Sequence, residues 1–274
     1  MQITAVPEGK YVDIKGGLRV HYHEEGEGPA IVWVHGSGPG ATGWSNFKGN
    51  YPEIAKAGYR CLVPDLIGFG FSTTDADVAY SWELLAGAIG DFCDALGLQD
   101  VTLVGNSMGG ALCIQAALDR PELFTRMILM APGGLEDREV YTEMKGIRTM
   151  LKIMYKQGIT RDSMRDIFKL QLFNEDLITE EIIDERFQVF PRQAKNILGQ
   201  VHVPNLSSRL KELACPVFGL WGVDDNFTPV SGAATLAREI DQVRVLSVNK
   251  CGHWVMVEHQ ALFNRMCLDF LQNG

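Results

Sequence analysis

A serine, an aspartate and a histidine in this 274-residue chain are candidates for a hydrolytic triad. Ser107 lies in the stretch Gly-Asn-Ser-Met-Gly, and Asp225 and His253 follow it in the chain order Ser, Asp, His. A serine hydroxyl is a poor nucleophile at neutral pH, so it needs a base within hydrogen-bond reach and an acid that orients this base. The three residues therefore predict nucleophilic attack on a carbonyl group.

The sequence around Ser107 is typical of a nucleophile elbow. The β-branched run 101–104 predicts a buried strand, and residues 108–119 predict a helix. A sharp turn between the two would expose the serine hydroxyl, and Gly105 and Gly109 would stand where side chains collide. For an isolated match, a plain glycine-containing connection is the alternative. The flanking strand and helix favour the elbow.

The base and its orienting acid are chosen by their positions after predicted strands. His253 follows the strand run 243–248, at the same end of the sheet as the serine turn. Two adjacent carboxylates, Asp224 and Asp225, compete for the role of acid. We expect Asp225, because Pro229 four residues later suits a turn before a helix, which leaves Asp224 as a turn residue.

Attack on a carbonyl creates an oxyanion, which needs N–H donors that are each worth roughly 3 kcal/mol of transition-state stabilisation. The backbone N–H of Met108 directly follows the elbow serine and is the first donor. The second is expected from the glycine-rich loop 35–40, at Ser37. His35 begins this loop, and we expect it to make a structural hydrogen bond rather than transfer protons.

Buried strand runs alternate with helical segments, which predicts an α/β fold with a mostly parallel central sheet and helices on both faces. The chain begins with an antiparallel hairpin about Gly16 and Gly17. The expected strands are 10–15, 19–24, 30–34, 60–64, 101–104, 127–130, 216–221 and 243–248, and the expected helical segments are 47–57, 82–96, 108–119, 233–240 and 260–271.

Residues 135–212 differ from this alternation, because they are rich in Met, Phe, Arg, Lys and Glu at helical spacing and contain no buried strand run. We expect a helical cap over the carboxyl ends of the strands, where open α/β sheets bind ligands. An ordinary surface excursion is the alternative. The predicted organisation is a hydrolase core formed by residues 1–134 and 213–274, interrupted by the cap.

The composition excludes several classes of partner. A net charge of −9 and a pI near 5.2 disfavour nucleic acid and anionic membranes, and no apolar window reaches membrane-spanning length. Six scattered cysteines without metal-ligand spacing indicate reduced thiols in a cytoplasmic protein. We expect neither a metal nor an organic cofactor, because residues 36–40 lack the Lys-Ser/Thr of a phosphate-binding loop.

With these motifs in hand, the chain resembles the α/β-hydrolase superfamily over its whole length. More narrowly, it looks like the meta-cleavage product hydrolases, the carbon-carbon bond hydrolases of aromatic catabolism. The resemblance is carried by His-Gly-Ser-Gly-Pro-Gly-Ala-Thr-Gly-Trp-Ser-Asn at 35–46, Gly-Asn-Ser-Met-Gly-Gly at 105–110, Trp-Gly-Val-Asp-Asp-Asn-Phe-Thr-Pro at 221–229, and Cys-Gly-His-Trp at 251–254 leading into Glu258 and His259.

The resemblance implies hydrolysis of a 2-hydroxy-6-oxohexa-2,4-dienoate, a ring-fission product, to a 2-hydroxypenta-2,4-dienoate and a carboxylic acid. It implies that the dienol is ketonised before the C6 ketone is attacked. Matching positions assign Asn46, Asn106 and Trp254 to the substrate pocket and Arg186 to the dienoate carboxylate, which suits a guanidinium fork. Arg192 is the rival cation. The family also implies a homo-oligomer and a small-molecule substrate as the partner.

One position departs from the family pattern. The place where relatives often carry a cap aromatic holds Gln171, which leaves the specificity for the acyl side of the substrate open. A carboxylesterase with the same triad is the first alternative function, and a carboxylate-binding Arg186 would argue against it. A small-molecule receptor without catalysis is the second alternative, and an intact triad argues against that.

Overall fold

The computed structural model describes residues 6–195 and 197–274, and they form one eight-stranded sheet in the order β1-β2-β4-β3-β5-β6-β7-β8. The first two strands and the β2–β4 pair are antiparallel, whereas the remaining neighbours are parallel. The strands are β1 (Lys10–Ile14), β2 (Leu18–Glu25), β3 (Ala30–Val34), β4 (Arg60–Pro64), β5 (Val101–Asn106), β6 (Phe124–Met130), β7 (Val217–Gly222) and β8 (Val243–Val248). The predicted α/β-hydrolase architecture is therefore confirmed.

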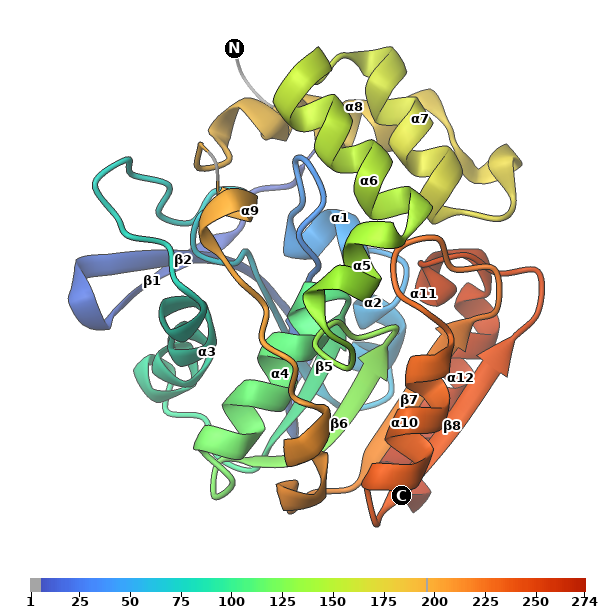
Figure 1. Cartoon of the computed structure of the whole chain (residues 1–274). Coiled ribbons are helices and arrows are strands. Elements are labelled where there is room, and N and C mark those ends of the chain that lie inside the picture. Colours follow the sequence, from blue (N-terminus) through green and yellow to red (C-terminus); the bar gives the residue numbers. More distant parts are fainter. Residues whose placement is uncertain (1–5, 196) are drawn as a thin grey trace.

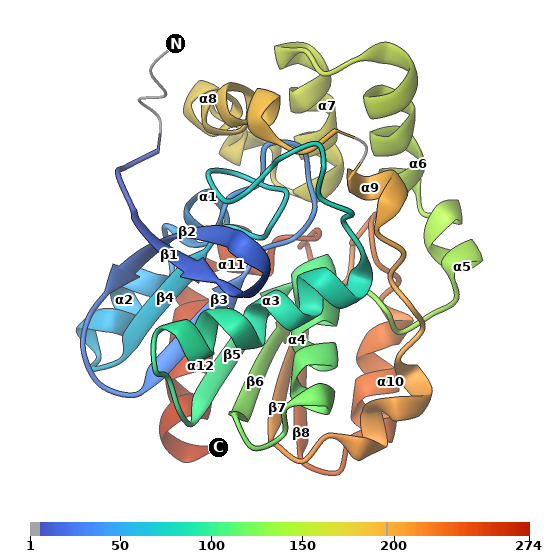
Figure 2. The same cartoon turned by 90° about the vertical axis from the view of Figure 1, so that its left-hand side faces the viewer.

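Helices cover both faces of the sheet, because successive residues of each buried strand point to opposite sides. In β3, Val32 and Val34 pack in the core beneath α3 (Trp82–Ala95), α4 (Met108–Asp119) and α10 (Ser231–Glu239). Ile31 and Trp33 pack in the second core with α1 (Gly43–Phe47), α2 (Tyr51–Lys56), α11 (Val255–Glu258) and α12 (Gln260–Asn273). The two layers are visible in Figure 1 and Figure 2.

The parallel strands end at one edge of the sheet. Val34 pairs with Gly105 and Asn106 pairs with Met130, and on the neighbouring pair Gly222 lies opposite Val248. The loops that follow β3, β5, β7 and β8 therefore leave the sheet side by side. These loops carry the residues predicted to do chemistry.

Short helices between β6 and β7 lie over this edge (Figure 1). They are α5 (Arg138–Glu143), α6 (Lys145–Lys152), α7 (Arg161–Gln171), α8 (Glu180–Val189) and α9 (Ile197–Gln200). Leu206 and Leu210, near the end of the predicted cap range, are buried in the core beneath α4 and α10. The cap boundaries at 135 and 212 stay a prediction.

The helix expected over 47–57 is found but is shorter, since α2 covers Tyr51–Lys56 and residues 48–50 separate it from α1, which ends at Phe47. A capping box between Thr42 and Ser45 begins α1, and Pro52 lies in the first turn of α2. A proline ring clashes with the carbonyl four residues earlier, so it ends one helix and suits the start of the next. In the described part of the chain no helix is long and apolar enough to cross a membrane.

Candidate active site

Ser107 stands in a strained turn between β5 and α4. Its backbone has φ of 56° and ψ of −123°, a region that residues other than glycine rarely occupy. Its N–H donates to the carbonyl of Met130 over 3.0 Å, which ties the turn to β6. A side chain at Gly109 would stand 2.3 Å from the carbonyl oxygen of Val34, so only glycine allows the helix to start this close to β3. The geometry is that of the predicted elbow.

His253 is buried and held from three sides. Its Nδ1 lies 2.7 Å from Oδ2 of Asp225, and its backbone N–H donates to the carbonyl of Gln171 over 2.7 Å. The ring of Phe227 stacks against the imidazole at 5.2 Å between centroids. These contacts orient the imidazole and leave Nε2 as its free nitrogen.

Asp225 accepts hydrogen bonds at both carboxylate oxygens. Oδ1 accepts from the backbone N–H groups of Phe227 (2.7 Å) and Thr228 (3.0 Å), and Oδ2 accepts from the Thr228 hydroxyl (2.7 Å). Asp224 is exposed, and its carboxylate accepts a long bond of 3.4 Å from the N–H of Cys251. Of the two adjacent aspartates, Asp225 is the one that meets His253.

Thr228 is a site residue that the sequence analysis missed. Its hydroxyl reaches the triad carboxylate because Asp225 begins a tight turn in which the residues two and three positions later fold back onto the side chain. The Asp-x-x-Thr spacing before α10 is the signal that could have found it.

Ser107 and His253 line the same cavity, together with residues from α7 and α8. Within residues 6–195 and 197–274 the Ser107 hydroxyl makes no hydrogen bond, so it is directed to no protein partner. Bonds between a nucleophile and its base often tighten only when substrate is bound. Ser107 and His253 share a cavity, and Asp225 bonds to His253, so the three predicted triad residues lie together.

The loop after β3 packs directly on the elbow. A side chain at Gly36 would stand 3.1 Å from Cβ of Ser107, which shows how closely the loop backbone approaches the serine. His35 Nδ1 lies 2.7 Å from the carbonyl oxygen of Gly36, and His35 Nε2 accepts the N–H of Leu66 over 2.9 Å. The peptide bond between Gly36 and Ser37 is trans, so its carbonyl and its N–H point in opposite directions. Because the carbonyl of Gly36 points toward His35, the N–H of Ser37 points away from it.

Burial lowers the pKa of His35 to about 4. Its imidazole is therefore neutral at the pH of ordinary metabolism, with Nδ1 as the donor and Nε2 as the acceptor. The expected structural hydrogen bond of this histidine is confirmed. Ser37 and Met108, the two predicted oxyanion donors, both line a cavity that contains Ser107.

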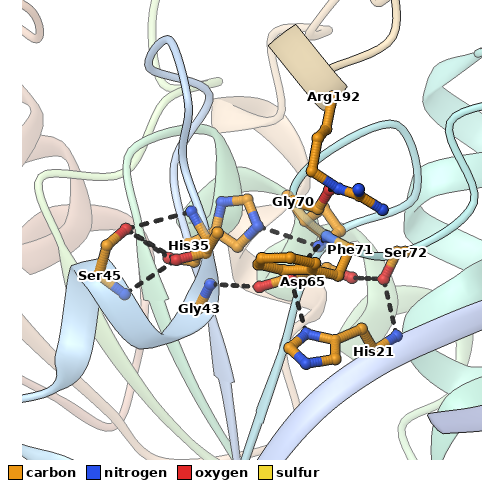
Figure 3. Close-up of polar contacts among 11 residues, drawn as sticks. His21, His35, Gly43, Ser45, Asp65, Gly70, Phe71, Ser72 and Arg192 are labelled. Carbon is orange, nitrogen blue, oxygen red and sulfur yellow. Dashed lines mark hydrogen bonds and ion pairs between the residues drawn. The ribbon is translucent and has the colours of Figure 1, made fainter. Parts of the chain in front are cut away.

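Asp65 bonds to three segments near the loop after β3 (Figure 3). Oδ1 accepts the N–H of Gly43 over 2.8 Å, and Oδ2 lies 3.0 Å from the N–H of Phe71 and 2.9 Å from Nδ1 of His21. Burial raises the pKa of Asp65, but the hydrogen bond from His21, together with the interactions with His35 and the N–H of Phe71, outweighs burial, so the pKa lies below its usual value. The carboxylate thus connects β2, α1 and the loop after β4.

Arg186 is a buried cation without an acidic partner in the described part of the chain. One of its terminal nitrogens donates to Oδ1 of Asn46, and Asn46 donates in turn to Oδ1 of Asn106 over 3.4 Å. The guanidinium lies over the ring of Trp254 at 5.0 Å from the centroid, and its Nε is buried without a hydrogen bond. Burial lowers the pKa of Arg186 to about 10, so it stays charged at neutral pH.

Arg192, the alternative cation, does not line either cavity that contains Ser107. Arg192 is exposed, donates to the carbonyl of Gly70 over 3.3 Å and lies 4.8 Å from the centroid of the Phe71 ring. Figure 3 shows it beside Gly70 and Phe71, in the loop after β4. Arg186, in contrast, lines the cavity of Ser107 and His253.

Two cavities meet at Ser107. The polar cavity, of about 30 Å³, is lined by Gly36, Ser37, Gly38, Asn46, Asn106, Ser107, Ile147, Met150, Gln171, Arg186, Phe227, His253 and Trp254. The larger cavity, of about 190 Å³, is lined by Ser37, Ser107, Met108, Gly133, Gly134, Arg138, Tyr141, Thr142, Ile147, Met150, Leu151, Leu198, Val201, His202, Val203, Phe227 and Thr228. Gln171 thus lies with Arg186 in the polar cavity, and not in the larger one.

A metal centre is not evident among the residues that the structure describes, since they contain no cluster of three or more His, Cys, Asp or Glu side chains able to hold an ion. All six cysteines are buried free thiols. Metal-independent activity stays a prediction.

Comparisons with known proteins identify the family of this chain. Residues 31–266 match the alpha/beta hydrolase family. The chain is 36% identical to a 2-hydroxy-6-oxononadienedioate/2-hydroxy-6-oxononatrienedioate hydrolase from Comamonas testosteroni, over 94% of this chain and 92% of the relative. It is also 36% identical to a 2-hydroxy-6-oxo-6-phenylhexa-2,4-dienoate hydrolase from Burkholderia cepacia, over 100% of this chain and 99% of the relative.

Solved structures show the same likeness. The meta-cleavage product hydrolase from Pseudomonas fluorescens IP01 (CumD) superposes with a TM-score of 0.86 at 26% identity, covering 97% of this chain and 98% of that one. An esterase from Exiguobacterium antarcticum superposes with a TM-score of 0.83 at 18% identity, over 97% of this chain and all of the esterase, which shows the fold alone. The chain belongs to the alpha/beta hydrolase family and, within it, to the meta-cleavage product hydrolases.

Proposed function

We propose that this protein hydrolyses the C5–C6 bond of a 2-hydroxy-6-oxohexa-2,4-dienoate, with Ser107 as nucleophile, His253 as base and Asp225 as the orienting acid. The products are a 2-hydroxypenta-2,4-dienoate and a carboxylic acid. One observation carries the proposal beyond the family: a buried guanidinium without an acidic partner lines the same cavity as the triad. A buried charge is costly unless it is paired, so Arg186 favours a ligand that brings a carboxylate.

The two cavities suggest how such a substrate lies. Its C1 carboxylate binds Arg186 in the polar cavity, and Asn46 keeps the guanidinium oriented. The conjugated chain then extends toward Ser107, where C6 is attacked. The group on C6 enters the larger cavity, whose inner wall includes Met150, Leu198 and other apolar side chains.

Ketonisation must precede cleavage, because the dienol offers no site for the electrons of the broken bond. The proton of the C2 hydroxyl is lost and a proton is added at C5, which gives a 2,6-dioxo-hex-3-enoate. When the C5–C6 bond then breaks, its electron pair is delocalised from C5 through C3=C4 onto the C2 oxygen. Arg186 beside the carboxylate stabilises the negative charge at this end.

Cleavage proceeds through an acyl-enzyme. His253 removes the proton of Ser107, whose oxygen attacks C6 and forms a tetrahedral oxyanion. The N–H groups of Met108 and Ser37 are the proposed donors to this oxyanion. Collapse of the intermediate leaves an ester on Ser107 and expels the dienolate, whose C2 oxygen takes the proton held by His253. His253, neutral again, deprotonates a water that attacks the ester, and the proton returns to the oxygen of Ser107 as the carboxylic acid is released.

A comparison of two substrates tests the proposal. A charge-assisted contact to a carboxylate is worth about 1.5 to 3 kcal/mol. The kcat/KM for a 2-hydroxy-6-oxohexa-2,4-dienoate should therefore exceed that for a simple ester of similar size by at least roughly tenfold. Arg186→Ala should reduce dienoate turnover and leave ester turnover nearly unchanged, and Arg192→Ala is the matched control. A wild-type preference for the ester would replace the proposal by a carboxylesterase.

We further propose that the protein works as a homo-oligomer in the cytoplasm, with a small-molecule substrate, without a metal or organic cofactor and without nucleic acid. The net charge of −9 and the six free buried thiols support the compartment and the absence of a nucleic-acid partner. Size-exclusion chromatography with light scattering tests the oligomeric state.

A further inference from the structure

The side chain of Gln171 lines the polar cavity and makes no hydrogen bond within residues 6–195 and 197–274. The residue is 6% exposed at the carboxyl end of α7. Three carboxamides line this cavity in the described part of the chain. Asn46 and Asn106 are bonded to Arg186, to each other and to the carbonyl of Met130, whereas the Gln171 carboxamide has no hydrogen bond. The amide therefore faces the cavity, where a ligand can supply its hydrogen bonds.

The backbone of Gln171 makes the contacts that hold the neighbouring segment in place. Its carbonyl accepts the N–H of His253 over 2.7 Å, and it lies against Gly252, where an added Cβ would stand 2.4 Å from the same oxygen. A substitution of the side chain leaves this hydrogen bond in place. The amide group is therefore free for another role.

Gln171 and Arg186 converge on one point. Nε2 of Gln171 and a terminal nitrogen of Arg186 lie 3.6 Å and 3.8 Å from the position that a Cβ on Gly38 would occupy. Gly38 leaves this space open, so a small polar group seated above it can reach both side chains. The C1 carboxylate and the C2 oxygen of a 2-hydroxy or 2-oxo carboxylate are two neighbouring polar groups of this size.

We infer that Gln171 binds the C2 oxygen of the substrate while Arg186 binds its C1 carboxylate. A carboxamide suits this task because its C=O can accept from the C2 hydroxyl and its NH₂ can donate to the C2 ketone. The same side chain thus serves the dienol and the ketonised form. The inference rests on the proposed function, since it names a contact within that substrate.

Binding to a variant that cannot turn over separates the inference from the proposed function. In the Ser107→Ala background, 2-hydroxy-6-oxohepta-2,4-dienoate and its 2-deoxy analogue, 6-oxohepta-2,4-dienoate, are titrated by absorbance. Adding Gln171→Leu should raise the Kd of the 2-hydroxy compound about tenfold, the effect of one buried hydrogen bond, and leave the Kd of the 2-deoxy analogue within about twofold. Gln171→Glu should weaken both ligands, because it sets a carboxylate beside theirs.

Gln157→Leu, an exposed glutamine of the same helical region, is the matched control and should change neither Kd. Unfolding temperatures report on folding, and Gln171→Met carries the same expectation if the leucine variant does not fold. An equal loss for both ligands, or no loss for either, overturns the inference. Wild-type protein that cleaves esters but not the dienoate overturns the proposed function, while the titrations still decide the role of Gln171. Failure of the Ser107→Ala variant to bind either compound overturns both.

Discussion

Asp225 and His253 are joined by a 2.7 Å hydrogen bond that links the turn after β7 to the turn after β8. The neighbouring carboxylate of Asp224 is exposed and points to the backbone of Cys251. Two adjacent residues of identical chemistry therefore differ in their role only because of their geometry. Only one of them can hold the imidazole in the tautomer that leaves Nε2 free to accept a proton.

Asp225→Asn should lower kcat by a factor on the order of 10³ to 10⁴, because an amide stabilises neither that tautomer nor the imidazolium. Asp224→Asn should change kcat by less than about threefold, since surface substitutions have small effects. Steady-state turnover of the dienoate, followed by loss of its yellow colour, measures both. Equal losses would show that the wrong neighbour has been assigned.

Ser107→Ala should abolish turnover while the dienoate still binds, because the hydroxyl is the nucleophile and other residues build the pocket. His253→Ala should be damaged comparably. Single-turnover absorbance measurements distinguish binding from cleavage. A Ser107→Ala variant that keeps more than a few per cent of the wild-type rate would contradict the nucleophile assignment.

Thr228→Val should lower kcat/KM by about tenfold, since it removes one hydrogen bond to an ionised carboxylate and preserves the shape of the side chain. The backbone N–H of Thr228 still bonds to Asp225 in this variant. Thr235→Val on α10 is the matched control, because its hydroxyl bonds only to the carbonyl of Ser231 at the surface. An unchanged rate in Thr228→Val would show that Asp225 is held by its other donors.

Acid should weaken the fold partly through His23. Burial and the nearby His21 lower the pKa of His23 to about 4, and its Nε2 is buried without a hydrogen bond. Between about pH 6.5 and pH 4 the unfolded chain binds a proton at His23 that the folded chain does not. The free energy of unfolding therefore falls as the pH falls, by about 1.4 kcal/mol per pH unit for this group.

His23→Leu should flatten this dependence. Chemical denaturation at pH 7 and pH 5 should show a smaller loss of unfolding free energy for the variant than for the wild type. His202→Leu, an exposed histidine, is the control and should lose as much as the wild type. Equal losses of unfolding free energy in wild type and His23→Leu would show that the acid sensitivity arises from other groups.

Dialysis against a chelator should leave dienoate turnover unchanged, because the proposed chemistry uses only side chains of the protein and backbone donors. Activity before and after dialysis, with and without added Mg²⁺, Mn²⁺ or Zn²⁺, measures this. Activity that disappears and returns with a divalent ion would contradict the metal-free mechanism.

The sequence by itself determined the α/β order of elements, the elbow and the chain order of the triad candidates. The physical reason is that each depends on local pattern and on one topological rule. Buried runs predict strands, and the carboxyl ends of parallel strands lie at one edge, so Ser107, Asp225 and His253 had to leave the sheet on the same side. The break between α1 and α2 was also local, and Pro52 was its overlooked signal.

Only the tertiary structure decided which cation lies beside the triad. Arg186 and Arg192 are six residues apart in helical segments of the same region, and the sequence around them carries no rule for their direction. The packing of α8 against the loop after β3 buries Arg186 at Asn46, whereas Arg192 remains at the surface beside Phe71. The placement of Gln171 in the polar cavity depends on the same packing, because the direction of a side chain on a cap helix is set by contacts with distant segments and not by its own neighbours in the chain.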